Sequence, residues 1–289
     1  MSDTKNITIA ALYKFTPMEN WGPELQTTWK NFMIDHEVKG TILLTPEGIN
    51  GTISGPKEGV DATLDMLKAE PGLADLDVKF SASATYPFKR TKVKLRQDPI
   101  PLGVEVDTSN AGIYVEPHDW NDIISAPDVI TIDTRNGYET LLGMFKGAED
   151  PQTQTFKELP QWVKQNLDPA QHKRIAMYCT GGIRCEKSTA FMKELGFDEV
   201  YHLKGGILRY LEEIPKEESL WEGECYVFDD RVAVDHDLQP SKTAAICKNC
   251  GHSLIAADLK RPTFEAGVSC PNCATVHGNV QQNQPATSA

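Results

Sequence analysis

The chain has 289 residues, enough for at least two domains at about 150 residues each, and 40% hydrophobic with 24% charged residues is a globular composition. The 29 basic and 41 acidic side chains give a formal net charge of −12, so any nucleic-acid-binding surface must be concentrated in one place. No apolar run approaches the roughly 18 to 20 residues of a membrane span, and the first ten residues lack a signal-peptide pattern, so we expect a cytoplasmic protein with no membrane partner.

The first hundred residues carry the pattern strand, helix, strand, strand, helix, strand. Apolar periodicity places these elements at Ile7–Phe15, Leu25–His36, Gly40–Leu44, Ile49–Ser54, Gly59–Ala69 and Asp77–Phe80. This order is typical of a ferredoxin-like (acylphosphatase-like) α+β sandwich. We therefore predict such a domain over residues 1–97.

Residues 98–116, rich in proline and polar side chains, are interpreted as a connector. Strands and helices then alternate at Val129–Ile132, Lys157–Asn166, Arg174–Tyr178, Glu186–Leu195, Val200–Leu203 and Ile207–Glu213. This alternation predicts a parallel α/β domain over residues 117–215. Residues 216–277 are expected to form an acidic linker and a cysteine-rich segment, and residues 278–289 a disordered tail.

Four of the seven cysteines form two C-x2-C pairs separated by 19 residues, namely Cys247, Cys250, Cys270 and Cys273. Two such pairs supply four thiolates for a tetrahedral Zn²⁺ ion, and a short segment with few apolar side chains needs such a crosslink to fold. Disulfide pairing is the alternative, disfavoured in a cytoplasmic protein. We predict a structural zinc ion, because four thiolates leave no open coordination position for catalysis.

The strongest chemical signal is the loop Cys179–Arg184, between a predicted strand and a predicted helix. Gly181 and Gly182 let the backbone curl so that its N–H groups point inward, and the helix N-terminus adds positive potential. Cys179 in such a position is held as a thiolate below the usual thiol pKa of about 8.5, and Arg184 adds a fixed positive charge. A buried structural cysteine beside a helix start is the alternative.

Spacing within this loop distinguishes two chemistries. A cysteine-class phosphatase has its arginine six positions after the cysteine, so that the loop encloses a phosphate group. Here Arg184 lies five positions after Cys179, and the sixth position is Cys185. The smaller loop favours a persulfide sulfur over a phosphate. Cys185 enters the helix and is expected to be packed there, or at most to act as a resolving thiol.

The sequence Cys179-Thr180-Gly181-Gly182-Ile183-Arg184 resembles the active-site loop of rhodanese domains. Further matching segments are Asp133-Thr134-Arg135 with Glu139, Gly143–Ala148 and Leu203–Ile207. The resemblance implies catalytic roles for Cys179 and Arg184. The residues expected to support the loop are Thr180, Gly181, Gly182, Ile183, Asp133 and Arg135, with Asp133 paired to a basic group.

The whole arrangement resembles the rhodanese-domain tRNA uridine hydroxylases, which install 5-hydroxyuridine at the wobble position. The segments Glu47–Thr52, Phe88–Lys94 and Tyr178–Lys187 carry this likeness, together with the cysteine-rich tail. It implies tRNA as partner, O2 as co-substrate and Cys179 as the essential cysteine. A sulfurtransferase carrying a persulfide is the alternative, and a non-catalytic adaptor is a third. No flavin, haem, iron or nucleotide-cofactor motif is present, so the sequence identifies no donor of electrons or sulfur.

A basic strip precedes the connector. Between residues 79 and 96 there are six basic residues and no acidic one, namely Lys79, Lys89, Arg90, Lys92, Lys94 and Arg96. An extended chain presents alternate residues on one face, where they can contact phosphates. Tyr86 and Phe88 could stack on unpaired bases, and Asn50 could orient a base or phosphate. A solvated edge strand is the alternative. We predict that Lys89, Arg90, Lys92, Lys94 and Asn50 bind tRNA and expect no DNA partner.

Overall fold

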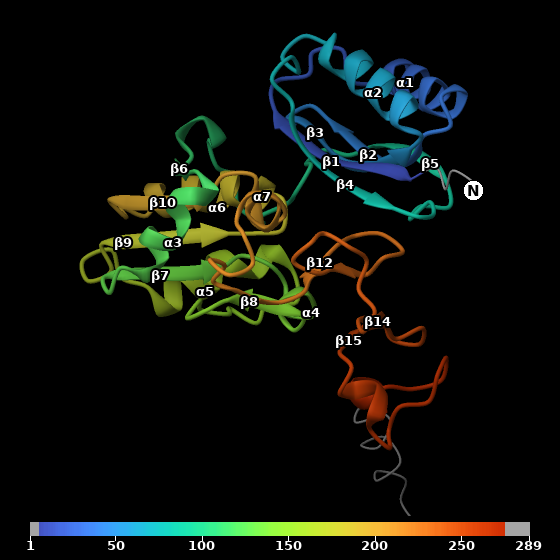
Figure 1. Ribbon diagram of the computed structural model, residues 1–289. Coiled ribbons are helices and arrows are strands. Elements are labelled where there is room, and N and C mark those ends of the chain that lie inside the picture. The colour runs from blue at the N-terminus through green and yellow to red at the C-terminus, as the bar shows by residue number, and fades with distance from the viewer. Residues whose placement is uncertain (1–5, 275–289) are drawn as a thin grey trace, which may run out of the picture.

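The computed structural model describes residues 6–274, and its N-terminal domain is one sheet in the order β4-β1-β3-β2-β5 covered by two helices (Figure 1). Its elements are β1 (Ile7–Phe15), α1 (Pro23–Asp35), β2 (Lys39–Thr45), β3 (Gly48–Gly55), α2 (Lys57–Lys68), β4 (Asp77–Ser83) and β5 (Thr91–Leu95). The predicted ferredoxin-like order is confirmed. The basic strip supplies a fifth strand, β5, which pairs in parallel with β2 at the sheet edge.

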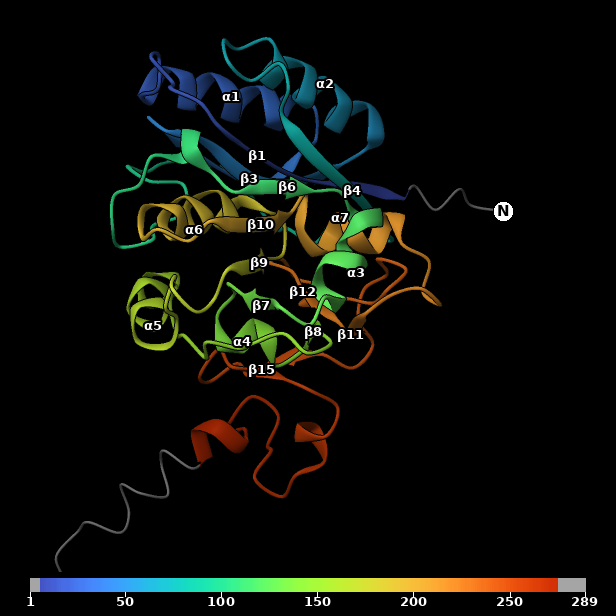
Figure 2. The same ribbon diagram turned by 90° about the vertical axis from the view of Figure 1, so that its left-hand side faces the viewer.

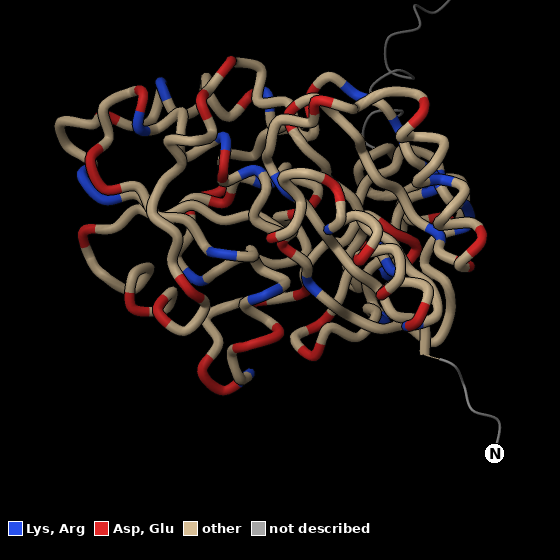
Figure 3. The backbone as a smooth tube through the Cα atoms, turned by 90° about the horizontal axis from the view of Figure 1, so that it is seen from above, with Lys and Arg blue, Asp and Glu red and all other residues tan. Residues whose placement is uncertain are grey.

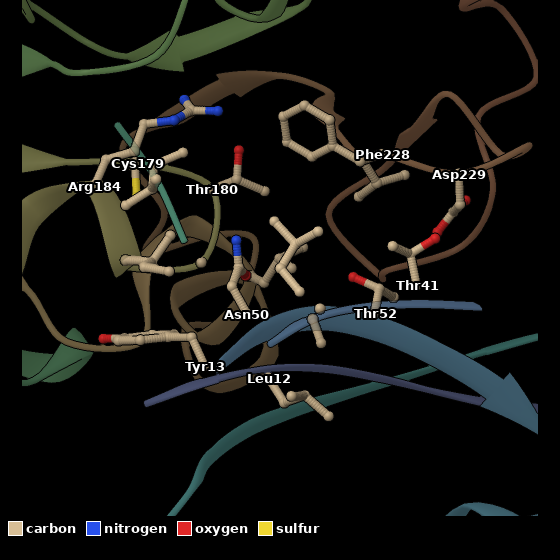
Figure 4. A pocket seen from close by; sticks show the side chains of 18 of the residues that line it. Leu12, Tyr13, Thr41, Asn50, Thr52, Cys179, Thr180, Arg184, Phe228 and Asp229 are labelled. Carbon is tan, nitrogen blue, oxygen red and sulfur yellow. The ribbon is translucent and has the colours of Figure 1, made fainter. Parts of the chain in front are cut away.

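The two faces of this sheet have different neighbours, because side chains alternate along each strand. Leu12, Ile42 and Ile49 are buried in the core with α1 and α2. Tyr13 and Asn50 belong to the other face, which is turned toward the second domain (Figures 1 and 4). The helix-free face of the first domain therefore covers part of the second.

The second domain contains a parallel sheet in the order β6-β10-β9-β7, as the alternation predicted. Its elements are η1 (Thr108–Asn110), β6 (Ile113–Val115), α3 (Pro117–Ser125), β7 (Val129–Asp133), α4 (Gly137–Thr140), β8 (Gly143–Phe145), η2 (Phe156–Glu158), α5 (Leu159–Asn166), β9 (Arg174–Tyr178), α6 (Ile183–Glu194), β10 (Glu199–Leu203) and α7 (Gly206–Glu213). Helices α5 and α6 lie on one face and α3 and α7 on the other (Figure 2). The segment interpreted as a connector contributes the edge strand β6.

The acidic segment after residue 215 packs against the second domain, in contrast to the expected linker. Strand β11 (Trp221–Gly223) pairs with β8, and β12 (Cys225–Tyr226) pairs with β13 (Ala233–Val234). Several of its apolar residues, including Trp221 and Cys225, are buried in the core of the second domain. The acidic net charge of the segment favoured its interpretation as a linker, and so gave no indication of these buried positions.

The chain continues with β14 (Ala245–Ile246), β15 (Ser253–Leu254) and η3 (Asp258–Lys260) in the cysteine-rich segment. Residues 278–289, predicted as a disordered tail, lie outside the described residues. Over residues 6–274, none of the helices combines the length and apolar character that crossing a bilayer requires.

Candidate active site and metal centre

Cys179 follows β9 directly and lies at the base of a tightly held loop (Figure 4). The Gly182 N–H donates to Cys179 Sγ at 3.1 Å, as the predicted backbone curl requires. Gly182 has φ +100°, and a Cβ atom there would lie 2.9 Å from the Tyr13 hydroxyl oxygen. Glycine is therefore required both by the backbone conformation and by the first domain. Helix α6 begins at Ile183, earlier than expected, because the left-handed Gly182 is already its N-cap.

Both cysteines near this loop are buried, but their surroundings favour opposite protonation states. Burial opposes ionisation of Cys179, yet the Cys185 thiol, the Arg184 charge and the backbone N–H groups of Arg184 and Gly182 together lower its pKa to about 6. Burial and the adjacent Cys179 sulfur raise the pKa of Cys185 well above its usual range. Cys179 is therefore the thiolate, and Cys185 is the neutral donor beside it.

We expect alkylation of Cys179 by iodoacetamide to accelerate as pH rises through about 6 and to level off above pH 7, because the thiolate is the reacting form. Replacing the Cys185 donor by alanine should move this midpoint to higher pH. Mass spectrometry of peptides after timed labelling gives both rates. Faster labelling of Cys185 than of Cys179 at pH 6.5 to 7 would contradict the assignment of the thiolate.

The side chain of Arg184 is held by the carboxylate of Glu139, which the sequence indicated only as part of a segment that matches rhodanese domains. Its Nη2 atom lies 2.8 Å from Glu139 Oε1, and the two side chains are 6% and 0% exposed. The Thr180 hydroxyl also donates to Glu139, at 3.4 Å. Glu139 thus ties both ends of the loop to α4. Gly181 lies in the same loop and lines the cavity in front of it.

Asp133 and Arg135 form a separate, fully buried ion pair behind the loop. Arg135 Nη2 donates to Asp133 Oδ2 at 2.6 Å and to the Gly143 carbonyl at 2.6 Å, with the Trp221 ring 5.1 Å from its guanidinium carbon. The pair thereby connects the end of β7 to β8 and β11. Among the described residues, no hydrogen bond or ion pair joins this pair to Cys179–Arg184, so the pair supports the scaffold around the loop.

A cavity of about 740 Å³ lies between the two domains, with Cys179 and Arg184 on its wall. The sheet of the first domain forms the opposite wall through Thr41, Asn50 and Thr52 (Figure 4). The acidic segment closes a third side through residues 227–229. Cys179 is only 1% exposed, so a substrate reaches its sulfur through this cavity.

The predicted tRNA-binding residues occupy two places. Lys89, Arg90 and Lys92 are exposed and Lys94 is half-buried, at the β5 edge. Asn50 lies in the cavity, where its amide donates to the Pro99 carbonyl at 3.4 Å. Basic and acidic positions are otherwise intermixed along the chain (Figure 3). The structure therefore places Asn50 with Cys179 and the four basic residues outside the cavity.

Two residues of the proposed strip have other roles. Lys79 is 3% exposed, pairs with Asp77 and lies over the Tyr13 ring, so its inclusion in a surface strip is corrected. The Tyr86 hydroxyl donates to the Glu37 carbonyl at 2.8 Å, and Lys39 lies over its ring. Tyr86 is therefore engaged within its own domain. The partners Tyr13, Glu37 and Lys39 were not visible in the local sequence, because they come from neighbouring strands and loops.

The four tail cysteines converge on one point. Their Sγ atoms all lie within 4.8 Å of one another, and the pairs Cys247–Cys273, Cys250–Cys270 and Cys270–Cys273 are 3.9, 3.6 and 3.6 Å apart. Tetrahedral zinc with Zn–S bonds of about 2.3 Å requires sulfur atoms about 3.8 Å apart. The cluster could therefore bind a metal ion such as zinc, and a few apolar side chains, including Leu254 and Phe264, pack around it.

We expect about one zinc ion per chain, lost when Cys247 and Cys250 are both replaced by serine, because two thiolates cannot replace a four-sulfur site. Inductively coupled plasma mass spectrometry of the purified protein measures this stoichiometry. Serine at Cys225, which lies in the second domain, should leave the metal content unchanged. A metal-free protein whose tail resists proteolysis would contradict the prediction.

The site and the fold define a rhodanese-like domain. Residues 116–213 match the rhodanese-like domain family, and residues 7–98 match the family described as UPF0176 acylphosphatase like domain. The chain therefore combines a UPF0176-type N-terminal domain with a rhodanese-like domain, an organisation consistent with the UPF0176 rhodanese-containing family.

Three solved structures are similar to part of the chain. A rhodanese-like domain from Anabaena is 19% identical, covers 38% of this chain and 78% of its own, and has a TM-score of 0.31. A rhodanese-related protein from Thermoplasma volcanium is 23% identical, and the match covers 35% of this chain and 92% of that protein, with a TM-score of 0.30. A Rhodopseudomonas palustris protein of unknown function, described as a possible tyrosine phosphatase, is 20% identical. The match covers 36% of this chain and 83% of that protein, with a TM-score of 0.31.

Proposed function

We propose that this protein is a tRNA-modifying oxidoreductase that converts the wobble uridine of tRNA to 5-hydroxyuridine, with O2 as co-substrate and Cys179 as the essential residue. One observation carries the proposal: the exposed basic residues follow directly in the chain after a residue that lines the cavity of the reactive cysteine. Phe88 lines that cavity, and the next two residues, Lys89 and Arg90, are exposed. A tRNA backbone held by the strip would thus lie at the cavity entrance.

The size and depth of the cavity fit an extruded base. Its volume of about 740 Å³ falls within the roughly 300 to 1,000 Å³ typical of small-molecule sites. Cys179 is too deeply buried to meet a stacked base, so the uridine would have to leave its stack to reach the sulfur. Unpaired anticodon bases cost least to extrude. The proposal therefore requires a single-stranded target, as the wobble position is.

Nucleoside mass spectrometry of tRNA from a deletion strain tests the function directly. We expect loss of 5-hydroxyuridine, restored by the wild-type gene. The lowered pKa of Cys179 and its backbone donor also suit a persulfide, so sulfur transfer to a thiol acceptor is the second candidate. The deletion strain could instead keep its 5-hydroxyuridine, while its extracts lose sulfur transfer from thiosulfate. That result would refute hydroxylation in favour of this alternative.

The basic strip should carry much of the affinity for tRNA. Replacing Lys89, Arg90, Lys92 and Lys94 by alanine should weaken binding and reduce the slope of log K against log salt by about 0.7 to 0.9 for each lost phosphate contact. Filter binding or fluorescence anisotropy at several salt concentrations measures the slope.

The matched control removes Lys30, Lys57 and Lys68, which are exposed on the helical face of the same domain, away from the cavity. It changes net charge by a similar amount but should leave the slope nearly unaltered. A strip variant with wild-type slope and a wild-type circular dichroism spectrum would remove β5 from the RNA site.

A further inference from the structure

One aromatic side chain on the wall of the active-site cavity is exposed. Phe228 is 54% exposed, although its neighbour Val227 is buried. Its ring contacts Tyr226 edge-on at 5.1 Å between centroids, and Tyr226 contacts Tyr138 at 5.3 Å. This row of rings holds Phe228 in place while the rest of its surface remains accessible from the cavity (Figure 4).

A buried hydrogen-bond donor without a partner lies beside this ring. Arg184 is 5% exposed, and its Nη2 atom is paired with Glu139. Its Nη1 atom, by contrast, has no hydrogen-bond partner among the residues that the structure describes. The guanidinium carbon lies 5.7 Å from the centroid of the Phe228 ring. Because a buried unpaired donor is costly, this atom is suited to an acceptor brought by a ligand.

The surrounding charges favour a neutral acceptor. The guanidinium of Arg184 already faces the Glu139 carboxylate and the Cys179 thiolate, both of which contribute to its raised pKa. An additional anion such as phosphate would add to two negative groups around one positive one. A carbonyl oxygen accepts from Nη1 without this repulsion.

We propose that Phe228 and Arg184 form a base-binding subsite in which a uracil ring stacks on Phe228 and its O4 atom accepts a hydrogen bond from Arg184 Nη1. The proposal rests on the proposed function for the choice of uracil. O4 is bonded to C4, which adjoins C5, so this contact brings the edge of the ring that contains the carbon to be hydroxylated toward the loop that holds Cys179. Cytosine has an amino donor in place of O4, and it would face another donor on Arg184.

Anticodon stem-loop RNAs test this subsite without requiring turnover. We would measure, by fluorescence anisotropy, the affinities for three RNAs that carry uridine, cytidine or an abasic residue at the wobble position. Wild-type protein should bind the uridine RNA about 5- to 150-fold more tightly than the abasic RNA, the range that base–aromatic stacking gives. It should also prefer uridine to cytidine.

Phe228→Leu should reduce the preference for uridine over the abasic residue to the part that the O4 contact supplies, because leucine fills space but offers no π face, whereas Phe228→Tyr should keep the full preference. Unchanged affinity for the abasic RNA would show that the Leu variant is folded. Phe32→Leu is the matched control, since Phe32 is half-buried on α1, away from the cavity, where it stacks on His36. It should bind all three RNAs as wild type does.

The outcomes separate this inference from the proposed function. Equal wild-type affinities for uridine and abasic RNA, or a preference that is undiminished in Phe228→Leu, would overturn the subsite even if 5-hydroxyuridine disappears from the deletion strain. Equal affinities for uridine and cytidine RNA would overturn the O4 contact. A uridine preference reduced in Phe228→Leu, with 5-hydroxyuridine unchanged in the deletion strain, would support the subsite and refute hydroxylation.

Discussion

Cys179→Ser should abolish formation of 5-hydroxyuridine while leaving tRNA binding within about twofold of wild type. The serine hydroxyl accepts the Gly182 N–H as the sulfur does, at 3.1 Å, so the loop should keep its shape. A hydroxyl is not ionised at neutral pH and cannot carry sulfane sulfur, however, so the reactive group is lost. The substitution therefore removes the reactive group without changing the conformation of the loop.

Complementation of a deletion strain, read by nucleoside mass spectrometry, measures this effect, and anisotropy measures binding. Cys185→Ser is the matched control: the same exchange six positions along, where the thiol is neutral and acts as a donor that a hydroxyl can replace. It should retain at least partial activity. Full activity in Cys179→Ser would refute the assignment, and the reverse pattern would place the reactive sulfur at Cys185.

Asp133→Ala should lower the free energy of unfolding by about 3 to 5 kcal/mol, because it leaves the Arg135 guanidinium buried without its counter-ion. Both side chains are 0% exposed, so water cannot replace the lost carboxylate. Arg135 also donates to Gly143, so the position of β8 should loosen with it. Urea denaturation followed by tryptophan fluorescence measures the change, since Trp221 lies against Arg135.

Asp198→Ala provides the comparison on the surface of the same domain. Asp198 lies 3.8 Å from Lys173 in a pair whose side chains are 74% and 59% exposed, so its removal should cost less than about 0.5 kcal/mol. If Asp133→Ala is no more destabilising than Asp198→Ala, the buried pair has no structural role.

The sequence was informative where chemistry depends on local spacing. The loop Cys179–Arg184 and the four tail cysteines each lie within short motifs, and the backbone N–H that stabilises the thiolate follows from Gly182 itself. Apolar periodicity likewise located most strands and helices of both domains, although it missed the edge strands β5 and β6 and the helix α3. These features need no knowledge of how distant segments meet.

The remaining parts of the site depend on how the domains dock. Tyr13 reaches the loop from 173 residues away in the chain through its hydrogen bond to Glu186, and Glu139 reaches Arg184 across 45 residues. Phe228 lies in a segment that its charge made look like a linker. The alternation of side chains along β1 predicts that Tyr13 lies on one face of the sheet. It does not predict which domain that face contacts.

The contacts that hold the first domain over Cys179 also decide which molecules can reach its sulfur. Tyr13 donates to Glu186 of α6 at 2.9 Å, and Arg209 of α7 donates to Asp77 at 2.6 Å, so the covering sheet is anchored to both of these helices. Small cellular thiols such as glutathione reduce persulfides and sulfenic acids by direct attack on the sulfur. Beneath this cover, an oxidised or sulfur-loaded Cys179 would outlive one on an isolated rhodanese-like domain, long enough to await a slowly diffusing macromolecule.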